Sequence, residues 1–236
     1  MAEEIADRKT VVTAQEMADA LYRAWYKYFG RPPAYHSILV LLSQWALETG
    51  SGKSMHNYNV GNVKARPDGP YDYQFFACNE RMSLQQARKL QQADPQHAKI
   101  TRDNGDGTCW IWFYPKHPGC CFRAFRTLDD GAFDHLVMLV NHKSFKQAWP
   151  AVEAGSPEQF SKLLRKAGYY TADESAYTAG VVRLYKGFEG KVKLPDPPLF
   201  TPDEEREIRN AVTLSLQKMS MELVESADCR PDEGEE

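Results

Sequence analysis

One stretch limits the folds open to this chain more than any other: an apolar run that ends abruptly in a glutamate and several small residues. Residues 34–48 carry apolar side chains at helical intervals, namely Ile38, Leu41, Leu42 and Trp45. This spacing predicts a helix with a buried inner face. Gly50 stands where a left-handed residue commonly ends a helix. The helix should therefore be a core element that ends at Glu48.

The residues after this helix allow two interpretations. Gly52, Lys53 and Ser54 resemble the end of a phosphate-binding loop. Such a loop needs another glycine five positions before Gly52, where this chain has Leu47, and it should follow a strand. The spacing therefore argues against nucleotide binding, and Lys53 and Ser54 are expected to be surface or loop residues.

The second interpretation gives the chemistry to Glu48. The C-terminal end of a helix disfavours negative charge, and an apolar neighbour such as Trp45 would desolvate the carboxylate. Both effects raise the pKa of Glu48, and a carboxyl group that keeps its proton can act as general acid in glycosidic bond cleavage. The small residues Gly50, Ser51 and Gly52 would leave open backbone beside it for a polymer. A helix-end glutamate that merely faces water remains the alternative.

Four segments in order resemble bacterial glucosaminidases of the lysozyme superfamily, the glycoside hydrolase family 73 group. They are "LETGSGKS" (47–54), "NYNVGNVK" (57–64), "CCFRAFRTLDDGAFDHLVML" (120–139) and "AGYYTADESAYTAGVVRLYKGFE" (167–189). The first two match the family's glutamate motif and its asparagine-rich segment. The last two match a strand that enters a helix and a closing Gly-Tyr-x-Thr-Asp…Tyr segment. The resemblance covers roughly residues 13–190.

The resemblance implies an α+β, mostly α-helical, lysozyme-like fold, with a helical lobe, a small β-rich lobe and a glycan cleft between them. It makes Glu48 the catalytic acid and Glu80 the candidate for a second acidic residue, which would position water or stabilise charge on the sugar. Asp72 and Asp68 compete for that second role, and Glu80 could instead be a solvated strand-end residue. The resemblance also suggests substrate-binding residues: Tyr58, Asn59, Asn62, Lys64, and Tyr169 and Tyr170, one of which is expected to reach the cleft near Glu48.

The rest of the chain divides into a catalytic domain and an extension. Residues 1–194 form the expected glucosaminidase domain, with an insertion at about 81–108. Helices are predicted at 13–30, 83–93, 128–141, 145–154, 156–168 and 173–188, and short strands at 73–78 and 109–114. Residues 195–236 form an acidic extension with a helix at about 202–224 and a disordered tail. The stripe of Ile208, Val212, Met219 and Leu223 gives this helix one apolar side.

Charge and cysteine usage add constraints. Residues 1–194 hold 25 lysines and arginines against 20 acids, a balance of +5, and residues 195–236 hold 4 against 12, a balance of −8, which together give −3. A mildly basic body suits an anionic polymer, and no nucleic acid partner is expected. The five cysteines are odd in number and include the adjacent pair Cys120 and Cys121, so reduced, mostly buried thiols are expected. The histidines and the turn at 103–107 lack metal-ligand spacing, so neither a metal nor a cofactor is expected.

The sequence thus predicts a peptidoglycan hydrolase that cleaves the β-1,4 bond of the glycan strand, as an N-acetylglucosaminidase with Glu48 as general acid. Muramidase or lytic transglycosylase activity on the same fold is the alternative, as is a non-catalytic peptidoglycan-binding module. Residues 1–10 lack the apolar core of a Sec signal, and no apolar run approaches a membrane span. We therefore expect a cytoplasmically made monomer that reaches the wall by phage lysis, virion delivery or specialised secretion. The C-terminal helix is a candidate dock for a carrier or regulator.

Overall fold

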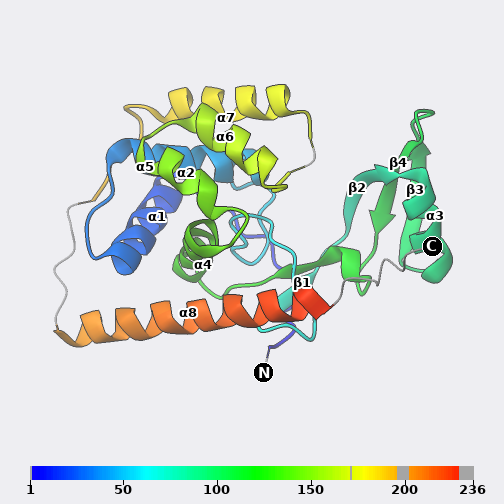
Figure 1. Cartoon of the computed structure of the whole chain (residues 1–236), viewed down its shortest axis with the longest axis horizontal. Coiled ribbons are helices and arrows are strands. Elements are labelled where there is room, and N and C mark those ends of the chain that lie inside the picture. The colour runs from blue at the N-terminus through cyan, green and yellow to red at the C-terminus, as the bar shows by residue number, and fades with distance from the viewer. Residues whose placement is uncertain (1, 171, 196–201, 229–236) are drawn as a thin grey trace. The chain divides into compact units, whose positions relative to one another are not determined.

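The computed structural model describes residues 2–170, 172–195 and 202–228. They fall into two compact units, which we call the β-rich unit, Met1–Arg8 with Asn62–Phe125, and the helical unit, Lys9–Gly61 with Arg126–Glu236. Figure 1 shows the elements of each. The architecture is α+β and mostly helical, as the sequence predicts.

The helical unit is built around one large apolar core. Its helices are α1 (Ala14–Phe29), α2 (Tyr35–Glu48), α4 (Leu128–Asn141), α5 (Trp149–Glu153), α6 (Pro157–Lys166), α7 (Glu174–Phe188) and α8 (Pro202–Asp228), with a short 3-10 turn η2 (Lys146–Ala148) before α5. The single helix predicted at 145–154 is thus this turn followed by α5. Every residue from Ser37 to Ala46 is buried. The apolar run in the sequence therefore forms the central helix of the unit.

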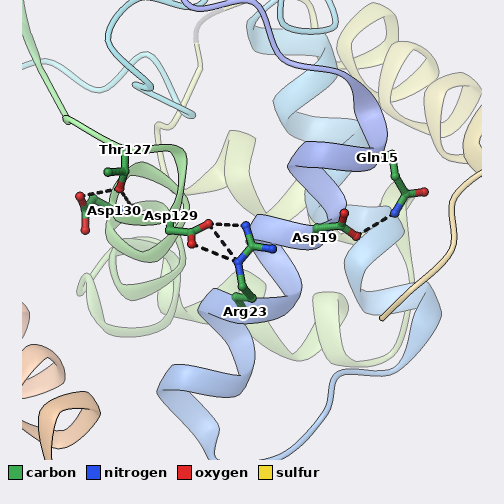
Figure 2. A network of polar contacts seen from close by, with 6 residues as sticks. All are labelled: Gln15, Asp19, Arg23, Thr127, Asp129 and Asp130. Atoms are coloured by element: carbon green, nitrogen blue, oxygen red, sulfur yellow. Dashed lines mark hydrogen bonds and ion pairs between the residues drawn. The ribbon is translucent and has the colours of Figure 1, made fainter. Parts of the chain in front are cut away.

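Helix α1 begins as the sequence predicts. The Thr13 hydroxyl accepts a hydrogen bond from the Glu16 backbone N–H, and the Glu16 carboxylate accepts one from the Thr13 backbone N–H. This reciprocal pair is a capping box. Further along α1, Arg23 donates to both carboxylate oxygens of Asp129 in the first turn of α4, with a shortest distance of 2.6 Å (Figure 2). Thr127, at the N-cap of α4, accepts from the Asp130 backbone N–H in the same region.

Helix α8 packs against α1 and α4. Met219 is buried in the core of the helical unit, and Val212 is packed against that core. Two residues of the predicted apolar stripe therefore face the core of the helical unit. The side chains of Ile208 and Leu223, the linker residues 196–198, Cys229 and the tail at 229–236 lie outside the described residues. The helix ends at Asp228, four residues beyond the predicted end.

The β-rich unit contains two small antiparallel sheets. One pairs β1 (Tyr73–Phe75) with β5 (Cys121–Arg123), just after the 3-10 turn η1 (Pro118–Cys120). The other has the order β2-β4-β3, formed by β2 (Cys78–Ser83), β4 (Thr108–Phe113) and β3 (Ala98–Asp103). The single strand predicted at 73–78 is therefore wrong, because the chain leaves the first sheet after Phe75 and enters the second at Cys78.

The predicted insertion at 81–108 is part of the second sheet. Helix α3 (Leu84–Ala93) begins after the N-cap Ser83, as predicted, and connects β2 to β3. It covers a second, smaller core that includes Ala87, Ile111 and Phe113. The sequence does not predict strands β2 and β3, because their residues are mostly half-buried or exposed and include few of the β-branched or aromatic residues that mark strands.

Candidate active site

Glu48 is the last residue of α2 and is half-buried. Its carboxylate oxygen Oε1 accepts a hydrogen bond of 2.6 Å from the hydroxyl of Tyr177 in α7. Burial raises the pKa of Glu48, and the hydrogen bond from Tyr177 opposes that rise only in part. The environment of Glu48 therefore favours a carboxyl group that keeps its proton above the usual range of glutamate.

Tyr177 is held in place by a second tyrosine. The rings of Tyr170 and Tyr177 stack with centroids 3.6 Å apart and planes 10° apart. The Tyr170 hydroxyl in turn donates to the backbone carbonyl of Ser161 in α6, at 3.3 Å. Burial and the neighbouring Glu48 raise the pKa of Tyr177, so its phenol remains a neutral donor. The two rings thus couple the carboxyl group to the packing of α6 and α7.

The sequence predicts that Tyr169 or Tyr170 lies near Glu48. In the structure the tyrosine that contacts Glu48 directly is Tyr177. Tyr170 lies behind it, with only 8% of its surface exposed. Tyr177 is the final tyrosine of the closing motif quoted above. Its position four residues after the N-cap Asp173 places it in the first turns of α7, next to the end of α2. The closing motif therefore includes the tyrosine that contacts Glu48, but the sequence does not show which of its tyrosines turns toward Glu48.

Backbone conformation and close packing explain the glycines that follow Glu48. Gly52 has φ +80°, and a Cβ added there would lie 2.5 Å from the backbone oxygen of Val12 and 2.9 Å from the ring of Trp45. Thr49 donates its hydroxyl to the carbonyl of Trp45 and accepts from the backbone N–H of Gly52. Gly50 is exposed, as predicted for open backbone, but Gly52 is buried, so part of that expectation is wrong. Gly52 is required by close packing.

The asparagine-rich segment forms a compact loop. Asn59 is 1% exposed, and Tyr58, at φ +51°, packs against the core of the helical unit. Tyr169 donates its hydroxyl to the carbonyl of Gly61, at 3.2 Å. A Cβ on Gly61 would approach both Tyr169 and a ring nitrogen of His135 to within 3 Å. Tyr169 and Gly61 therefore fix the end of this loop within the helical unit.

The β-rich unit brings two other predicted residues together. Lys64 Nζ forms an ion pair of 2.7 Å with Glu80 on β2, and it lies 4.1 Å from the centroid of the Phe122 ring. Lys64 Nζ also donates to the carbonyl of Gly119. Both charged side chains are about two-fifths exposed. Glu80 is thus a solvent-accessible carboxylate beside a lysine with several contacts, while Asn62 is half-buried at φ +49° at the start of the unit.

The two competing aspartates have other contacts. The Asp72 carboxylate accepts a hydrogen bond of 2.9 Å from the backbone N–H of Glu3, within the β-rich unit. Asp68 is 82% exposed and lies 3.7 Å from Arg66. Asp68 thus also forms an ion pair, but a longer one than the 2.7 Å pair that joins Glu80 to the motif residue Lys64. Geometry therefore favours Glu80, although its catalytic role stays a prediction.

Four of the five cysteines, Cys78, Cys109, Cys120 and Cys121, lie in the described residues and are free thiols. Burial raises the pKa of Cys120 and of Cys121 to about 11. No group of three or more histidine, cysteine, aspartate or glutamate side chains in the described part of the chain is placed to hold a metal ion. Among those residues, too, no helix has both the length and the apolar character of a membrane span.

Comparison with known proteins gives one match. A family model described as "Glucosaminidase: Mannosyl-glycoprotein endo-beta-N-acetylglucosaminidase" matches residues 35–190, more than half of the 236-residue chain. No curated protein and no solved structure matches the chain significantly. The matched region starts with α2, includes Glu48, Glu80 and the stacked tyrosines, and ends after α7. The chain therefore belongs to the glucosaminidase family and is a glycoside hydrolase that acts on peptidoglycan.

Proposed function

We propose that the chain is an endo-β-N-acetylglucosaminidase that cleaves the β-1,4 bond of the glycan strand with Glu48 as its general acid. The observation that carries this proposal is the half-buried carboxyl of Glu48, whose pKa is raised by burial and whose Oε1 is bonded to Tyr177. General acid catalysis of glycosidic cleavage needs a carboxyl group that is still protonated at the working pH.

The contact with Tyr177 suggests how the proton is held and released. Because Tyr177 donates to Oε1, the proton of the neutral acid resides on Oε2, from which it passes to the glycosidic oxygen as the bond breaks. Glu48 is left as a carboxylate. The hydrogen bond from Tyr177 is stronger to that anion than to the neutral acid, so it stabilises the product of the proton transfer. An interaction that strengthens during reaction accelerates the chemical step.

Glu80 is proposed as the second carboxylate, which positions water or stabilises positive charge on the sugar. Its support is the exposed ion pair with Lys64, a residue of the asparagine-rich motif. An accessible, ionised carboxylate suits either task, whereas Glu48 is suited to donate a proton. Two carboxyl groups in unlike environments are typical of enzymes that cleave glycosidic bonds.

Product analysis tests the bond specificity. Purified peptidoglycan is digested with the protein, and the fragments are identified by mass spectrometry after reduction. A reducing N-acetylglucosamine end supports the proposal. A reducing N-acetylmuramic acid end would make the enzyme a muramidase, and an anhydro-muramic end would make it a lytic transglycosylase. Binding to peptidoglycan without release of any fragment would identify a non-catalytic module.

A further inference from the structure

Strand β4 presents aromatic side chains on the face of its sheet that is turned away from the small core. Along the strand, Cys109, Ile111 and Phe113 are buried, whereas Trp110 and Trp112 between them are only half-buried. Tyr114 continues the alternation and is 37% exposed. Neither tryptophan belongs to the core of the β-rich unit or of the helical unit. Large aromatic groups left outside a core often mark a binding surface.

The strand register shows which residues surround these rings. Trp112 lies opposite Asn79 on β2 and Lys99 on β3. Trp110 lies opposite Arg81 on β2 and, after a register irregularity in β3 between Ile100 and Arg102, opposite Arg102. Directly paired residues in an antiparallel sheet share a face and have Cβ atoms about 5 Å apart. Three basic side chains therefore flank the aromatic stripe, which we call the tryptophan face: Trp110, Trp112, Tyr114, Arg81, Lys99 and Arg102.

Two contacts place the basic groups more closely. Lys99 Nζ lies 5.5 Å from the centroid of the Tyr114 ring. Arg81 forms an ion pair of 2.7 Å with Asp106, which offsets its charge, so Lys99 and Arg102 supply the excess positive charge. Glu80 lies opposite Ile111 and is therefore on the other side of the sheet. The tryptophan face is thus separate from the candidate catalytic carboxylate of this unit.

We propose that the tryptophan face is a further binding site for the glycan strand, on the opposite side of its sheet from Glu80. This proposal rests on the proposed function for the identity of the glycan. Residues on one face of a strand recur about every 6.6 Å, so the stripe from Trp110 to Tyr114 spans about 13 Å, more than the length of one pyranose ring. Flat sugar rings can stack on such a stripe through their C–H faces.

The positive charge of the tryptophan face indicates which glycan polymer it binds. The stem peptides of peptidoglycan carry free carboxylates, and arginine and lysine are the side chains that pair with carboxylates. A neutral glycan such as chitin would use the aromatic rings and leave Lys99 and Arg102 without a role. A single-stranded nucleic acid would also suit aromatic rings with basic neighbours. Peptidoglycan is favoured because the family acts on it, and the other two polymers are arms of the test.

The tryptophans themselves provide a direct readout. The chain has five tryptophans, and Trp25, Trp45 and Trp149 are at most 8% exposed. Fluorescence quenching by acrylamide therefore reports mainly on Trp110 and Trp112. Soluble peptidoglycan fragments with stem peptides should protect the intact protein from quenching. This protection should disappear in W110F/W112F, which keeps aromatic rings on the sheet but removes both reporters. Absence of protection in the parent at fragment concentrations that saturate hydrolysis would overturn the proposal.

Affinity is measured separately by sedimentation with insoluble sacculi. W110A/W112A should bind at least about ten-fold more weakly, because central aromatic groups dominate the free energy of most interfaces. Leu214→Ala, at a residue of α8 that is 55% exposed, is the control for loss of an exposed apolar side chain. If W110A/W112A does not fold, K99Q/R102Q is the second variant, with Lys143→Gln as its charge control. It should weaken binding to peptide-bearing fragments and spare chitooligosaccharides.

The remaining outcomes separate this site from the proposed function. If the parent hydrolyses sacculi and W110A/W112A binds them as tightly as the parent does, the tryptophan face is rejected as a binding site, and the proposed activity is unaffected. Protection of the tryptophans without any hydrolysis would support the tryptophan face and reject the proposed activity. Protection by single-stranded DNA but not by glycan fragments would overturn the proposal in favour of a nucleic-acid site.

Discussion

Glu48 and Glu80 lie in contrasting surroundings. Glu48 ends a helix that is buried from Ser37 to Ala46 in the helical unit, and its carboxylate accepts a hydrogen bond from the neutral hydroxyl of Tyr177. Glu80 lies on an edge strand of the β-rich unit, with two-fifths of its side chain exposed and an ammonium group 2.7 Å away. Burial raises the pKa of Glu48. This difference fits the proposed roles, in which Glu48 donates a proton and Glu80 positions water or stabilises charge on the sugar.

The units that carry these two carboxyl groups differ in the size of their apolar cores. The helical unit has a large apolar core, which can desolvate a carboxyl group at its margin. The β-rich unit has a small core, and strands β2 and β3 carry exposed residues, so polar groups on them remain close to water. A carboxyl group takes its chemical character from the unit that carries it. The following predictions test this contrast, from the largest expected effect on activity to the smallest.

The substitution Glu48→Gln keeps the shape of the side chain and removes the transferable proton. Loss of a general acid lowers the rate by roughly 10²–10⁴-fold. Turbidity loss of purified sacculi measures the effect, and Glu189→Gln, at an exposed glutamate that follows α7, is the matched control. Near-normal clearing by the Glu48 variant would remove Glu48 from the mechanism.

Glu80→Gln should lower turnover by about 10²-fold if the carboxylate positions water or stabilises the sugar cation. The melting temperature should stay close to that of the parent, because an exposed ion pair contributes little to stability. Asp72→Asn is the matched comparison, because the Asp72 carboxylate accepts a hydrogen bond from the backbone N–H of Glu3. If Asp72→Asn cripples the enzyme and Glu80→Gln does not, the second carboxylate is Asp72.

Tyr177→Phe removes a hydrogen bond and keeps the ring that stacks on Tyr170. The bond lowers the pKa of Glu48, so its loss should raise that pKa further. The high-pH limb of the profile of kcat/KM, where the general acid loses its proton, should therefore move to higher pH. The maximal rate should fall about ten-fold, because a hydrogen bond to a developing carboxylate is lost. An unchanged profile would show that Tyr177 does not act on Glu48.

Thermal stability tests the burial of Glu48 without measuring activity. Well below pH 4 the carboxyl is protonated in both the folded and the unfolded chain, so Glu48→Gln and the parent should melt at similar temperatures. As the pH rises through the raised pKa, the folded parent must ionise a half-buried group and loses stability. The variant should then melt about 2–4 °C higher than the parent at neutral pH. A variant that is less stable at pH 7 than the parent would contradict the desolvated state of Glu48.

Removal of the acidic extension should have the smallest effect on activity. Helix α8 packs on α1 and α4, whereas Glu48 lies where α2 meets α7. A chain that ends at Lys193 should fold and hydrolyse sacculi at the parental rate, with a lower melting temperature because Met219 no longer covers the core. An insoluble or inactive truncation would show that the extension belongs to the catalytic core.

Local rules account for the parts of the fold that the sequence predicts well. The capping box at Thr13 and the helix at 128–141 are confirmed, because caps and apolar periodicity are written in adjacent residues. Strand β2 escaped prediction, because it pairs with β4 across the intervening α3 and β3, and β3 escaped it because its sequence carries few strand-forming residues. Position at a helix end fits a water-facing glutamate as well as a catalytic one, and it is the motif around it, residues 47–64, that singles out Glu48. The choice of Tyr177 over Tyr169 and Tyr170 depends on how α7 packs against α2, which no local pattern determines.

The most direct test of the central claim is a ¹³C NMR titration of the glutamate carboxyl carbons, with Glu48→Gln used to assign the resonance of Glu48. We expect one resonance that titrates clearly above the ordinary glutamate pKa of about 4.3 and is missing from the variant. In Tyr177→Phe the same resonance should titrate at still higher pH. A Glu48 resonance that titrates at or below the ordinary value would contradict the assignment of Glu48 as a buried, proton-holding acid.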